Sequence, residues 1–163
     1  MPVWGGFDTV RKIVGRTRED ERMEIQHVRE VDDELMEAME RLIPQLSTAR
    51  VPARAEAEEL VASQASHLLV ARDPHIVGML TLVVFRTPTG VHAWIEDVVV
   101  DGVVRGRGLG EALTLAGISL ARELGVSEVN LTSRPSREAA NRLYQRIGFQ
   151  QRNTNVYRYG LNE

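Results

Sequence analysis

The sequence predicts an α/β fold in which helices cover one mixed sheet. Segments with apolar residues at helical spacing interleave along the chain with short β-branched or alternating segments, and this order is typical of α/β proteins. With 163 residues, of which 43% are hydrophobic and 26% charged, the chain has the size and composition of one compact domain.

The first third of the chain is expected to contain one strand and two helices. A short alternating segment predicts a strand over Met23–Val28. Asp32 can cap a helix whose apolar stripe ends near Pro44, and a weaker helix is expected over Ala55–Ala65. Residues 1–22 are expected to be an N-terminal extension that can form a short helix.

The middle of the chain is expected to form three consecutive strands. The residue pattern predicts strands over His67–Ala71, Ile76–Phe85 and Val91–Val100. The first two are joined by the turn Asp73-Pro74-His75, and the hairpin Thr87–Gly90 joins the last two.

The last third is expected to alternate helices with strands. A strong apolar face predicts a helix over Leu109–Leu124. Ser136 can cap another helix, which runs to Arg146 and is stopped by Gly148. Three further strands are predicted, over Glu128–Thr132, Phe149–Gln151 and Val156–Leu161, the last two as an antiparallel pair.

Composition and charge narrow the class of protein. The net charge of −3 and the pI near 5.9 give no general attraction to nucleic acid or to an anionic membrane. No cysteine is present, so disulfides and thiolate chemistry are excluded, and the absence of a signal-peptide pattern predicts a cytoplasmic protein. The histidines have no partner at metal-ligand spacing, so no metal site is expected.

The most informative stretch runs from Trp94 to Leu113 and joins a strand to a helix through a glycine-rich loop. The loop contains Gly102, Gly106, Gly108 and Gly110, where missing Cβ atoms let backbone amides approach a ligand. Unpaired amides at the positive end of a helix dipole favour an anion. We therefore expect this loop to bind a phosphate-bearing ligand.

Two common glycine loops do not match. The Walker loop requires Gly-Lys-Ser/Thr, but Gly110 is followed by Glu111 and Ala112. The dinucleotide fingerprint would start at Gly106 and Gly108, and its third glycine would then fall on Glu111.

The pattern that does match is Arg105-x-x-Gly108-x-Gly110 after an extended valine run. It resembles the acetyl-CoA pyrophosphate loop of the GNAT (Gcn5-related) N-acetyltransferase superfamily. A second segment, Arg137–Phe149, reads Arg-Glu-Ala-Ala-Asn-Arg-Leu-Tyr-Gln-Arg-Ile-Gly-Phe and resembles the late helix of the same superfamily. The chain is identified as a member on these two segments together.

The resemblance implies the GNAT acyl-CoA N-acyltransferase fold over residues 23–163, with about six to seven strands and four helices. It also implies acetyl-CoA as cosubstrate, bound in part where a strand splays from its neighbour and frees backbone amides, with the Val99 N–H as the candidate donor to the thioester carbonyl. The residues implied to bind the cosubstrate are Val98, Val99, Val100, Arg105, Gly106, Arg107, Gly108, Leu109, Gly110, Glu111, Asn141 and Tyr144.

The resemblance also supplies candidates for catalysis. Tyr144 matches the tyrosine that lies near the CoA sulfur and donates a hydrogen bond to the departing thiolate. Glu96 lies where many members carry a glutamate that removes an amine proton through water, and Asp97 is the second candidate base. Strand alternation would make the two carboxylates face opposite ways, and a purely structural acidic pair is the other interpretation.

The leading hypothesis is an acetyl-CoA-dependent N-acetyltransferase that acts on a primary amine of a small molecule by direct attack in a ternary complex. The alternatives are a protein or peptide N-acetyltransferase and a non-catalytic acyl-CoA-binding regulatory module. Homodimers are common in the superfamily, so a dimer is compatible with the resemblance.

The acceptor side is less defined by sequence. The runs Ile95–Val100 and Arg105–Gly110 are similar to glucosamine-phosphate N-acetyltransferases, but this likeness covers the cofactor half alone. Arg50 and Arg54 could bind an anionic acceptor or be ordinary surface charges. His92 and Trp94 alternate on the face of Glu96, so either could border the acceptor.

Overall fold

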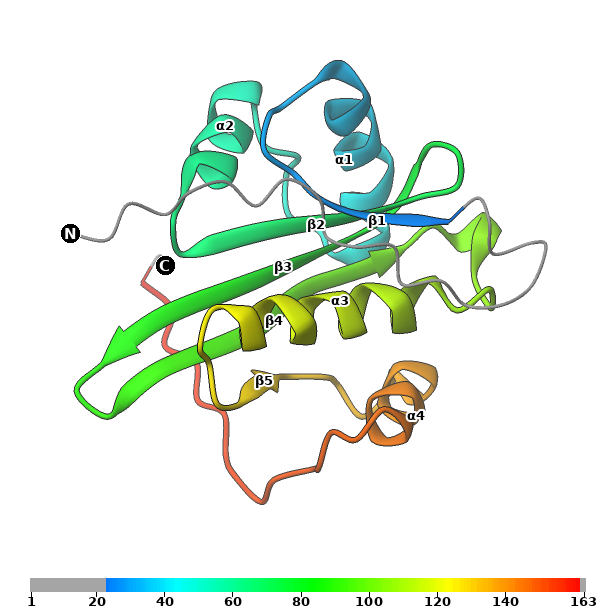
Figure 1. The fold of residues 1–163 in the computed structure, drawn as a ribbon. Coiled ribbons are helices and arrows are strands. Elements are labelled where there is room, and N and C mark those ends of the chain that lie inside the picture. The colour runs from blue at the N-terminus through cyan, green and yellow to red at the C-terminus, as the bar shows by residue number, and fades with distance from the viewer. Residues whose placement is uncertain (1–22, 162–163) are drawn as a thin grey trace. The chain divides into compact units, whose positions relative to one another are not determined.

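The computed structural model describes residues 23–161, and the predicted N-terminal extension over residues 1–22 lies outside them. The chain divides into two compact units, one that ends at Thr132 and one that begins at Ser133. The first contains the whole sheet and three of its α-helices, and the second contains the last helix and the C-terminal segment (Figure 1).

The sheet has five strands in the order β1-β2-β3-β4-β5. The first four are antiparallel to their neighbours, and β5 runs parallel to β4. This confirms the predicted mixed sheet and places each of these strands within about two residues of its predicted limits. The strands are β1 (Glu24–His27), β2 (Ser66–Arg72), β3 (Ile76–Thr87), β4 (Gly90–Val100) and β5 (Val129–Leu131).

Helices cover both faces of this sheet. In Figure 1, α1 (Asp33–Leu46) and α2 (Arg54–Ala62) lie on one face, and α3 (Leu109–Glu123) lies on the other. The predicted α/β class is thereby confirmed. The fourth α-helix, α4 (Glu138–Arg146), belongs to the second unit. None of the described helices is long and apolar enough to cross a membrane.

The core beneath α1 and α2 follows from the apolar stripe of α1. Asp32 caps this helix as predicted, because its Oδ1 accepts a hydrogen bond of 2.7 Å from the Leu35 amide. The apolar side of α1 then packs against alternate residues of three strands. The buried members of this core are Leu35, Ala38, Met39, Leu42, Ala57, Leu68, Val70, Ile76, Met79 and Val99.

The opposite face depends on a close approach of α3 to the sheet at Gly78. A Cβ at this position would lie 3.0 Å from the Val99 carbonyl oxygen and 3.1 Å from Leu113 Cδ1. A larger residue here would crowd the β4 backbone at Val99 and the Leu113 side chain of α3.

One helix end agrees with its predicted position and another differs from it. α1 ends at Leu46, near Pro44 as predicted, and the proline in the last turn removes only one of the helix hydrogen bonds. α2 ends at Ala62 rather than Ala65, because the Ser63 hydroxyl accepts hydrogen bonds from the amides of Ala65 and Ser66, both at 3.2 Å.

The predicted final strand pair, Phe149–Gln151 and Val156–Leu161, is wrong, and the sheet accordingly has five strands rather than six to seven. These residues alternate in a β-favouring way, but their backbone enters no ladder within the described residues. Their side chains are almost all exposed; Tyr157, for example, is 87% exposed. Propensity without a partner strand does not fix an extended segment.

Two histidines form an edge-to-face pair across β1 and β2. The rings of His27 and His67 are 5.2 Å apart between centroids. Burial, with smaller contributions from Arg29 and His67, lowers the pKa of His27 from 6.5 to about 4. Burial and Arg29 also lower the pKa of His67. Both imidazoles are therefore held in the neutral form.

This pair predicts a specific loss of stability in acid. The unfolded chain protonates His27 near pH 6.5, whereas the folded chain does so near pH 4. The stabilisation present above pH 6.5 is therefore lost progressively as the pH falls toward 4. In urea titrations across this interval, His27→Gln should show a shallower fall of the unfolding free energy than the native chain. His75→Gln, at an exposed histidine, should not; a native slope in His27→Gln would contradict the interpretation.

Candidate active site

A β-bulge interrupts β4 at the two candidate bases. Thr81 of β3 pairs with Glu96, and Met79 pairs with Val99. Between these pairs β3 has one residue and β4 has two, Asp97 and Val98. Asp97 adopts a φ of 52°, a left-handed conformation that a non-glycine residue rarely takes.

The extra residue changes which face of the sheet each side chain occupies. Ile95 lies near α3, since a Cβ on Gly117 of that helix would be 3.6 Å from Ile95 Cδ1. Val99 lies in the core under α1 and α2. Without a bulge these two residues would share a face. Strand alternation was the reason to expect that Glu96 and Asp97 point to opposite faces of the sheet. The bulge breaks this alternation at Asp97.

The same register determines which backbone amides of β4 are free. The Asp101 amide donates to the Val77 carbonyl at 2.8 Å. Because hydrogen-bonded pairs alternate in an antiparallel ladder, the Val99 amide also points toward β3, and those of Val98 and Val100 point away from it. This moves the expected amide donor from Val99 to its two neighbours.

The side of β4 away from β3 is open beyond Ile95. β5 pairs with β4 over Ala93, Trp94 and Ile95 only. β4 continues to Val100 without a β5 partner, and β5 ends before Pro135, which has no amide hydrogen to donate. Among the described residues, the amides of Val98 and Val100 therefore face no neighbouring strand.

The glycine loop that follows β4 ends at the start of α3, where several backbone amides are unpaired. Gly106 and Gly108 have φ values of 82° and 80°, and Gly108 is the N-cap of the helix. Within the described part of the chain, the amides of Gly108, Leu109 and Gly110 meet no acceptor, as expected for the first turn of a helix. These donors lie at the positive end of α3, where the sequence predicts an anion cradle.

The beginning of the loop, in contrast, is held by α1. Asp101 is only 6% exposed and accepts hydrogen bonds from Arg41 Nε at 2.9 Å and from Gln45 Nε2 at 3.4 Å. Gln45 Oε1 in turn accepts from the Gly102 amide at 2.9 Å. Arg41 also donates to the Ile76 carbonyl at 2.5 Å, which ties the start of β3 to the same helix.

These contacts keep Asp101 ionised. Burial alone would raise the pKa of Asp101, but hydrogen bonds from the Val103 amide, Arg41 and Gln45, together with the charge of Arg41, lower it below its usual value. The amides of residues 102–104 are thus occupied by protein groups at Gln45 and Asp101. Only the later part of the loop remains open to a ligand.

The two loop arginines differ in their partners. Arg107 forms an ion pair of 2.6 Å with Asp73, whose side chain is 7% exposed in the β2–β3 turn. Arg105 donates through Nε to the Val100 carbonyl at 3.3 Å, and the loop exposes its side chain. Arg107 is therefore largely neutralised by the protein, and Arg105 is the cation that the loop presents to an anion.

The environment of Glu96 suits a proton acceptor. Partial burial, and then the neighbouring Asp97 carboxylate, raise the pKa of Glu96 above its usual value. A raised pKa makes a carboxylate a stronger base at neutral pH, and such shifts concentrate at functional sites.

A comparison with known proteins identifies the arrangement. Residues 28–149 match the model of the Acetyltransferase (GNAT) family. The chain belongs to the GNAT family. The predicted membership is thus confirmed, and the matched range includes the bulged β4, the glycine loop and α4.

Relatives and solved structures agree with this family. The chain is 38% identical over 85 residues to a mycothiol acetyltransferase of Renibacterium salmoninarum, which covers 50% of this chain and 25% of that protein. It is 32% identical over 113 residues to glucosamine 6-phosphate N-acetyltransferase 1 of Oryza sativa subsp. japonica, covering 65% of this chain and 67% of that protein. The chain thus spans about a quarter of the mycothiol enzyme.

Among solved structures, the fold is similar to that of an aminoglycoside acetyltransferase from an uncultured soil metagenomic sample. The TM-score is 0.76 at 22% sequence identity, covering 88% of this chain and 99% of that chain. At this identity the likeness concerns the GNAT fold.

The late GNAT helix, α4, lies in the second unit and carries Tyr144 and Asn141. α4 begins at Glu138, with Arg137 rather than the predicted Ser136 at the N-cap, because the turn is closed by the Arg137 amide donating to the Arg134 carbonyl at 3.0 Å. Asn141 Nδ2 donates to the same carbonyl at 3.0 Å.

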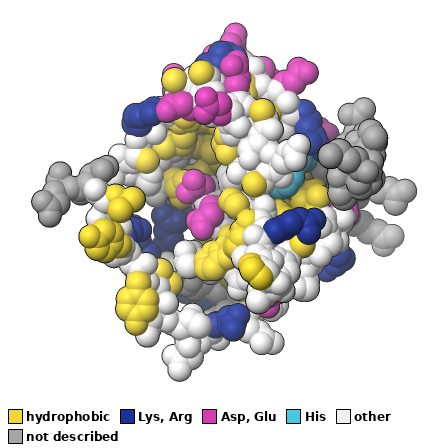
Figure 2. Space-filling model, turned by 90° about the vertical axis from the view of Figure 1, so that its left-hand side faces the viewer, with side chains coloured by type: hydrophobic (Ala, Val, Ile, Leu, Met, Phe, Trp, Pro, Cys, Tyr) yellow, Lys and Arg dark blue, Asp and Glu magenta, His cyan; other side chains and the backbone are white. Residues whose placement is uncertain are grey.

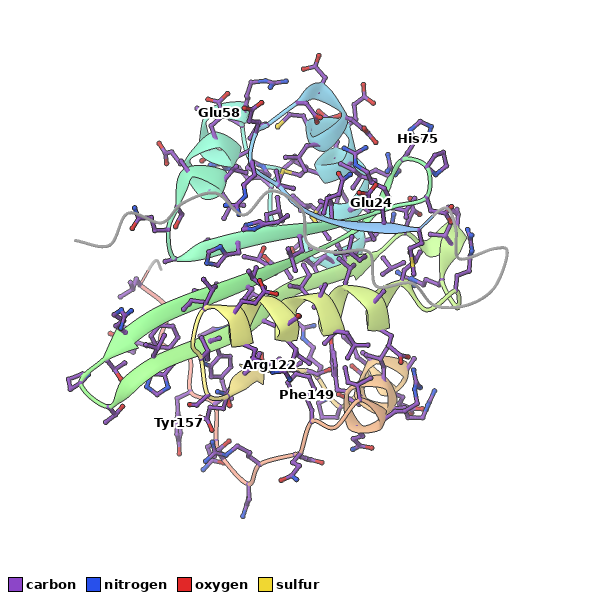
Figure 3. All side chains as sticks on the ribbon, in the orientation of Figure 1. Glu24, Glu58, His75, Arg122, Phe149 and Tyr157 are labelled. Atoms are coloured by element: carbon purple, nitrogen blue, oxygen red, sulfur yellow. The ribbon has the colours of Figure 1, made fainter. Side chains whose placement is uncertain are left out.

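Tyr144 is oriented within this unit by the chain that follows α4. Its ring meets the ring of Phe149, labelled in Figure 3, edge-on at 5.8 Å between centroids. Burial raises the pKa of Tyr144, against a smaller opposing effect of Arg137. The phenol is therefore protonated at neutral pH and able to donate a hydrogen bond.

The two arginines considered for an anionic acceptor are paired within the protein. Arg50 bonds both oxygens of Glu56, and Arg54 pairs with Asp33 and donates to the Val31 carbonyl at 3.0 Å. Acidic side chains are prominent over α1 and α2 at the top of Figure 2, and Glu58, labelled in Figure 3, is one of those on α2. This surface gives no support to an anionic acceptor.

Sequence reasoning missed the residues that support the loop. Arg41 and Asp101 are 60 positions apart, and no spacing pattern connects them. Asp73 was interpreted only as a turn residue, although its carboxylate holds Arg107. Among the described residues, no group of three histidines and carboxylates could hold a metal ion.

The support of the loop predicts a large effect for a residue outside the family motif. Asp101→Ala should lower the free energy of unfolding by about 2 kcal/mol, because Arg41, Gln45 and the Val103 amide all lose a buried acceptor. Asp33→Ala removes the carboxylate that pairs with Arg54, but the Asp33 side chain is 92% exposed. This substitution should therefore change the free energy of unfolding by less than about 0.5 kcal/mol. Equal losses in urea titrations would show that Asp101 is not a special anchor.

Proposed function

We propose that this chain binds acetyl-CoA and transfers the acetyl group to a primary amine of a small molecule, by direct attack in a ternary complex. The observation that carries the proposal is the pair of open amide sets, one at the β4 gap and one at the start of α3. GNAT membership provides the chemical class, and the geometry provides donors suited to a diphosphate and to an extended amide-bearing arm.

In this proposal the cosubstrate is held mainly by the main chain. The segment Val98–Val100 provides two outward amides for the pantetheine arm, and Arg105–Glu111 provides the cradle for the diphosphate. Within the second segment, Gly106 and Gly108 supply the backbone conformation, and Arg105 supplies the positive charge. Arg107 contributes through its ion pair with Asp73, which fixes the loop.

The chain's acidic residues account for activation of the amine. A primary ammonium is mostly charged at neutral pH, so it must lose a proton before it can attack. Acetyl-CoA supplies the electrophilic thioester. Glu96, with its raised pKa, is the proposed base, and Asp97 at the bulge both raises that pKa and provides a second carboxylate.

The proposed roles on α4 follow from the family. Tyr144 remains protonated and can donate a hydrogen bond to the leaving thiolate, which would stabilise the negative charge that forms on the CoA sulfur. Asn141 uses its amide hydrogen locally, which leaves the carboxamide oxygen as an acceptor for the pantetheine amide groups.

The names of the relatives support small-molecule amines as acceptors. A mycothiol acetyltransferase, a glucosamine 6-phosphate N-acetyltransferase and an aminoglycoside acetyltransferase are all similar to this chain. A non-catalytic acyl-CoA-binding module would need neither a carboxylate at Glu96 nor a phenol at Tyr144.

Binding of the cosubstrate is tested by thermal unfolding. At a hundredfold excess over Kd, acetyl-CoA should stabilise the native chain by about 2.7 kcal/mol and raise its Tm. Arg105→Gln should weaken acetyl-CoA binding about fivefold, through loss of one charge-assisted contact, and Arg86→Gln, at an exposed arginine of β3, should have no effect. A native chain whose Tm does not move at saturating acetyl-CoA would refute the proposal.

Catalysis is tested by the pH profile of CoA release. Glu96→Gln should lower kcat by about a hundredfold or more near neutral pH and recover rate as the pH approaches the amine pKa. Its acetyl-CoA affinity should stay native, since Glu96 is outside the cradle. A pH profile parallel to that of the native chain would remove Glu96 from the base role, and unchanged turnover would favour a different base altogether.

A further inference from the structure

The sheet face under α1 and α2 continues beyond its core as a row of partly uncovered side chains. Met79 belongs to that core, so Thr81, Val83 and Phe85, at alternate positions of β3, lie on the same face. Their partners on β4 are Glu96, Trp94 and His92. The opposite face is occupied by Leu80 and Ile95, which lie against Gly117 of α3.

Three of these side chains form what we call the aromatic row: Trp94, His92 and Phe85. The rings of Phe85 and His92 are stacked, with centroids 5.7 Å apart and planes 28° apart. Phe85 is 39% exposed, and both His92 and Trp94 are half-buried. Partly exposed ring surface is therefore presented on a paired strand rather than on a loop.

The position of His92 is fixed by the hairpin. Its Nε2 lies 2.9 Å from the Thr87 hydroxyl and 3.2 Å from the Thr89 hydroxyl. These threonines therefore place hydroxyl groups at the edge of the His92 ring, and Thr81 is paired with Glu96 at the other end of the row. The surface thus combines flat apolar faces with polar groups at their edges.

The row begins at the proposed base. On a strand, residues two apart are about 7 Å apart, so Trp94 lies about 7 Å and His92 about 14 Å along β4 from Glu96. An amine at Glu96 that is attached to a ring would place that ring over Trp94. A second ring unit would reach the stacked pair of Phe85 and His92.

We propose that the aromatic row is the acceptor-binding surface and that the acceptor amine is carried on a saturated, hydroxylated ring, as in amino sugars. The C–H face of such a ring packs on an aromatic face, and its hydroxyls use the threonine and histidine groups at the edges. The carboxylates of Glu96 and Asp97 attract its ammonium group. The inference rests on the proposed function because Glu96 is taken as the base.

The experiment compares amines that share charge but differ in shape. Glucosamine carries a ring, glucamine (1-amino-1-deoxysorbitol) is an acyclic polyhydroxylated amine, and 2-phenylethylamine carries an aryl ring without hydroxyls. Trp94→Leu should raise KM for glucosamine by about three- to tenfold, the value of one aromatic contact, with little change in kcat. KM for glucamine should not change.

Matched variants separate stacking from a general structural effect. Trp94→Phe should restore most of the glucosamine affinity, since it keeps an aromatic face. His92→Gln should affect larger two-ring amines such as neamine more than glucosamine. An equal KM increase for glucosamine and glucamine in Trp94→Leu, or a preference of the native chain for 2-phenylethylamine, would overturn the proposal.

A binding measurement without acetyl-CoA distinguishes this inference from the proposed function. The full chain has two tryptophans, so Trp4→Phe assigns the Trp94 indole signal in a ¹⁵N spectrum. Glucosamine should shift that signal, and glucamine should not. If acetyl-CoA fails to raise the Tm, the proposed function fails even where the indole shifts. If acetyl-CoA binds and the indole shifts with neither or with both amines, the aromatic row fails as the acceptor surface.

Discussion

One additional residue in β4 determines most of what is specific about this chain. Between the pairs that Glu96 and Val99 make with β3, the strand must accommodate Asp97 and Val98 opposite a single residue. The bulge shifts the alternation of side chains along β4 by one position. As a result, Val99 enters the core under α1 and lies on the same face of the sheet as Trp94 and Glu96. A single backbone irregularity thereby places the candidate base Glu96, the Trp94 ring and the outward amides of Val98 and Val100 at neighbouring positions.

The glycine loop shows a division between fixed and open parts. Its first residues are bonded to α1 through Asp101 and Gln45, and its arginine at 107 is bonded to the β2–β3 turn. The amides at the start of α3 are left without protein acceptors among the described residues. Rigid support beside unpaired donors is the arrangement that electrostatic preorganisation requires.

The sequence predicted those parts of the fold that local patterns control. Strand alternation located β1 to β5, and the apolar stripe of α1 with its Asp32 cap located that helix. The β-favouring residues Val156–Leu161 were assigned a strand because propensity carries no information about whether a pairing partner is available.

The parts that could not be predicted depend on contacts between distant positions. Nothing in the sequence relates Arg41 to Asp101, or Asp73 to Arg107, because each pair forms only when the helix, the turn and the loop have been brought together. The direction of the Val98 and Val100 amides, away from β3, likewise depends on the position of the bulge in β4. Amino-acid composition does not specify that position.

The ion pair between Asp73 and Arg107 has a consequence for how the two loop arginines would respond to substitution. With the Arg107 guanidinium already paired, Arg105 is the loop cation left to meet the proposed diphosphate. The remaining attraction would come from the fixed peptide dipoles at the start of α3. A replacement of Arg107 would therefore act on the path of the loop, whereas a replacement of Arg105 would act on the anion directly.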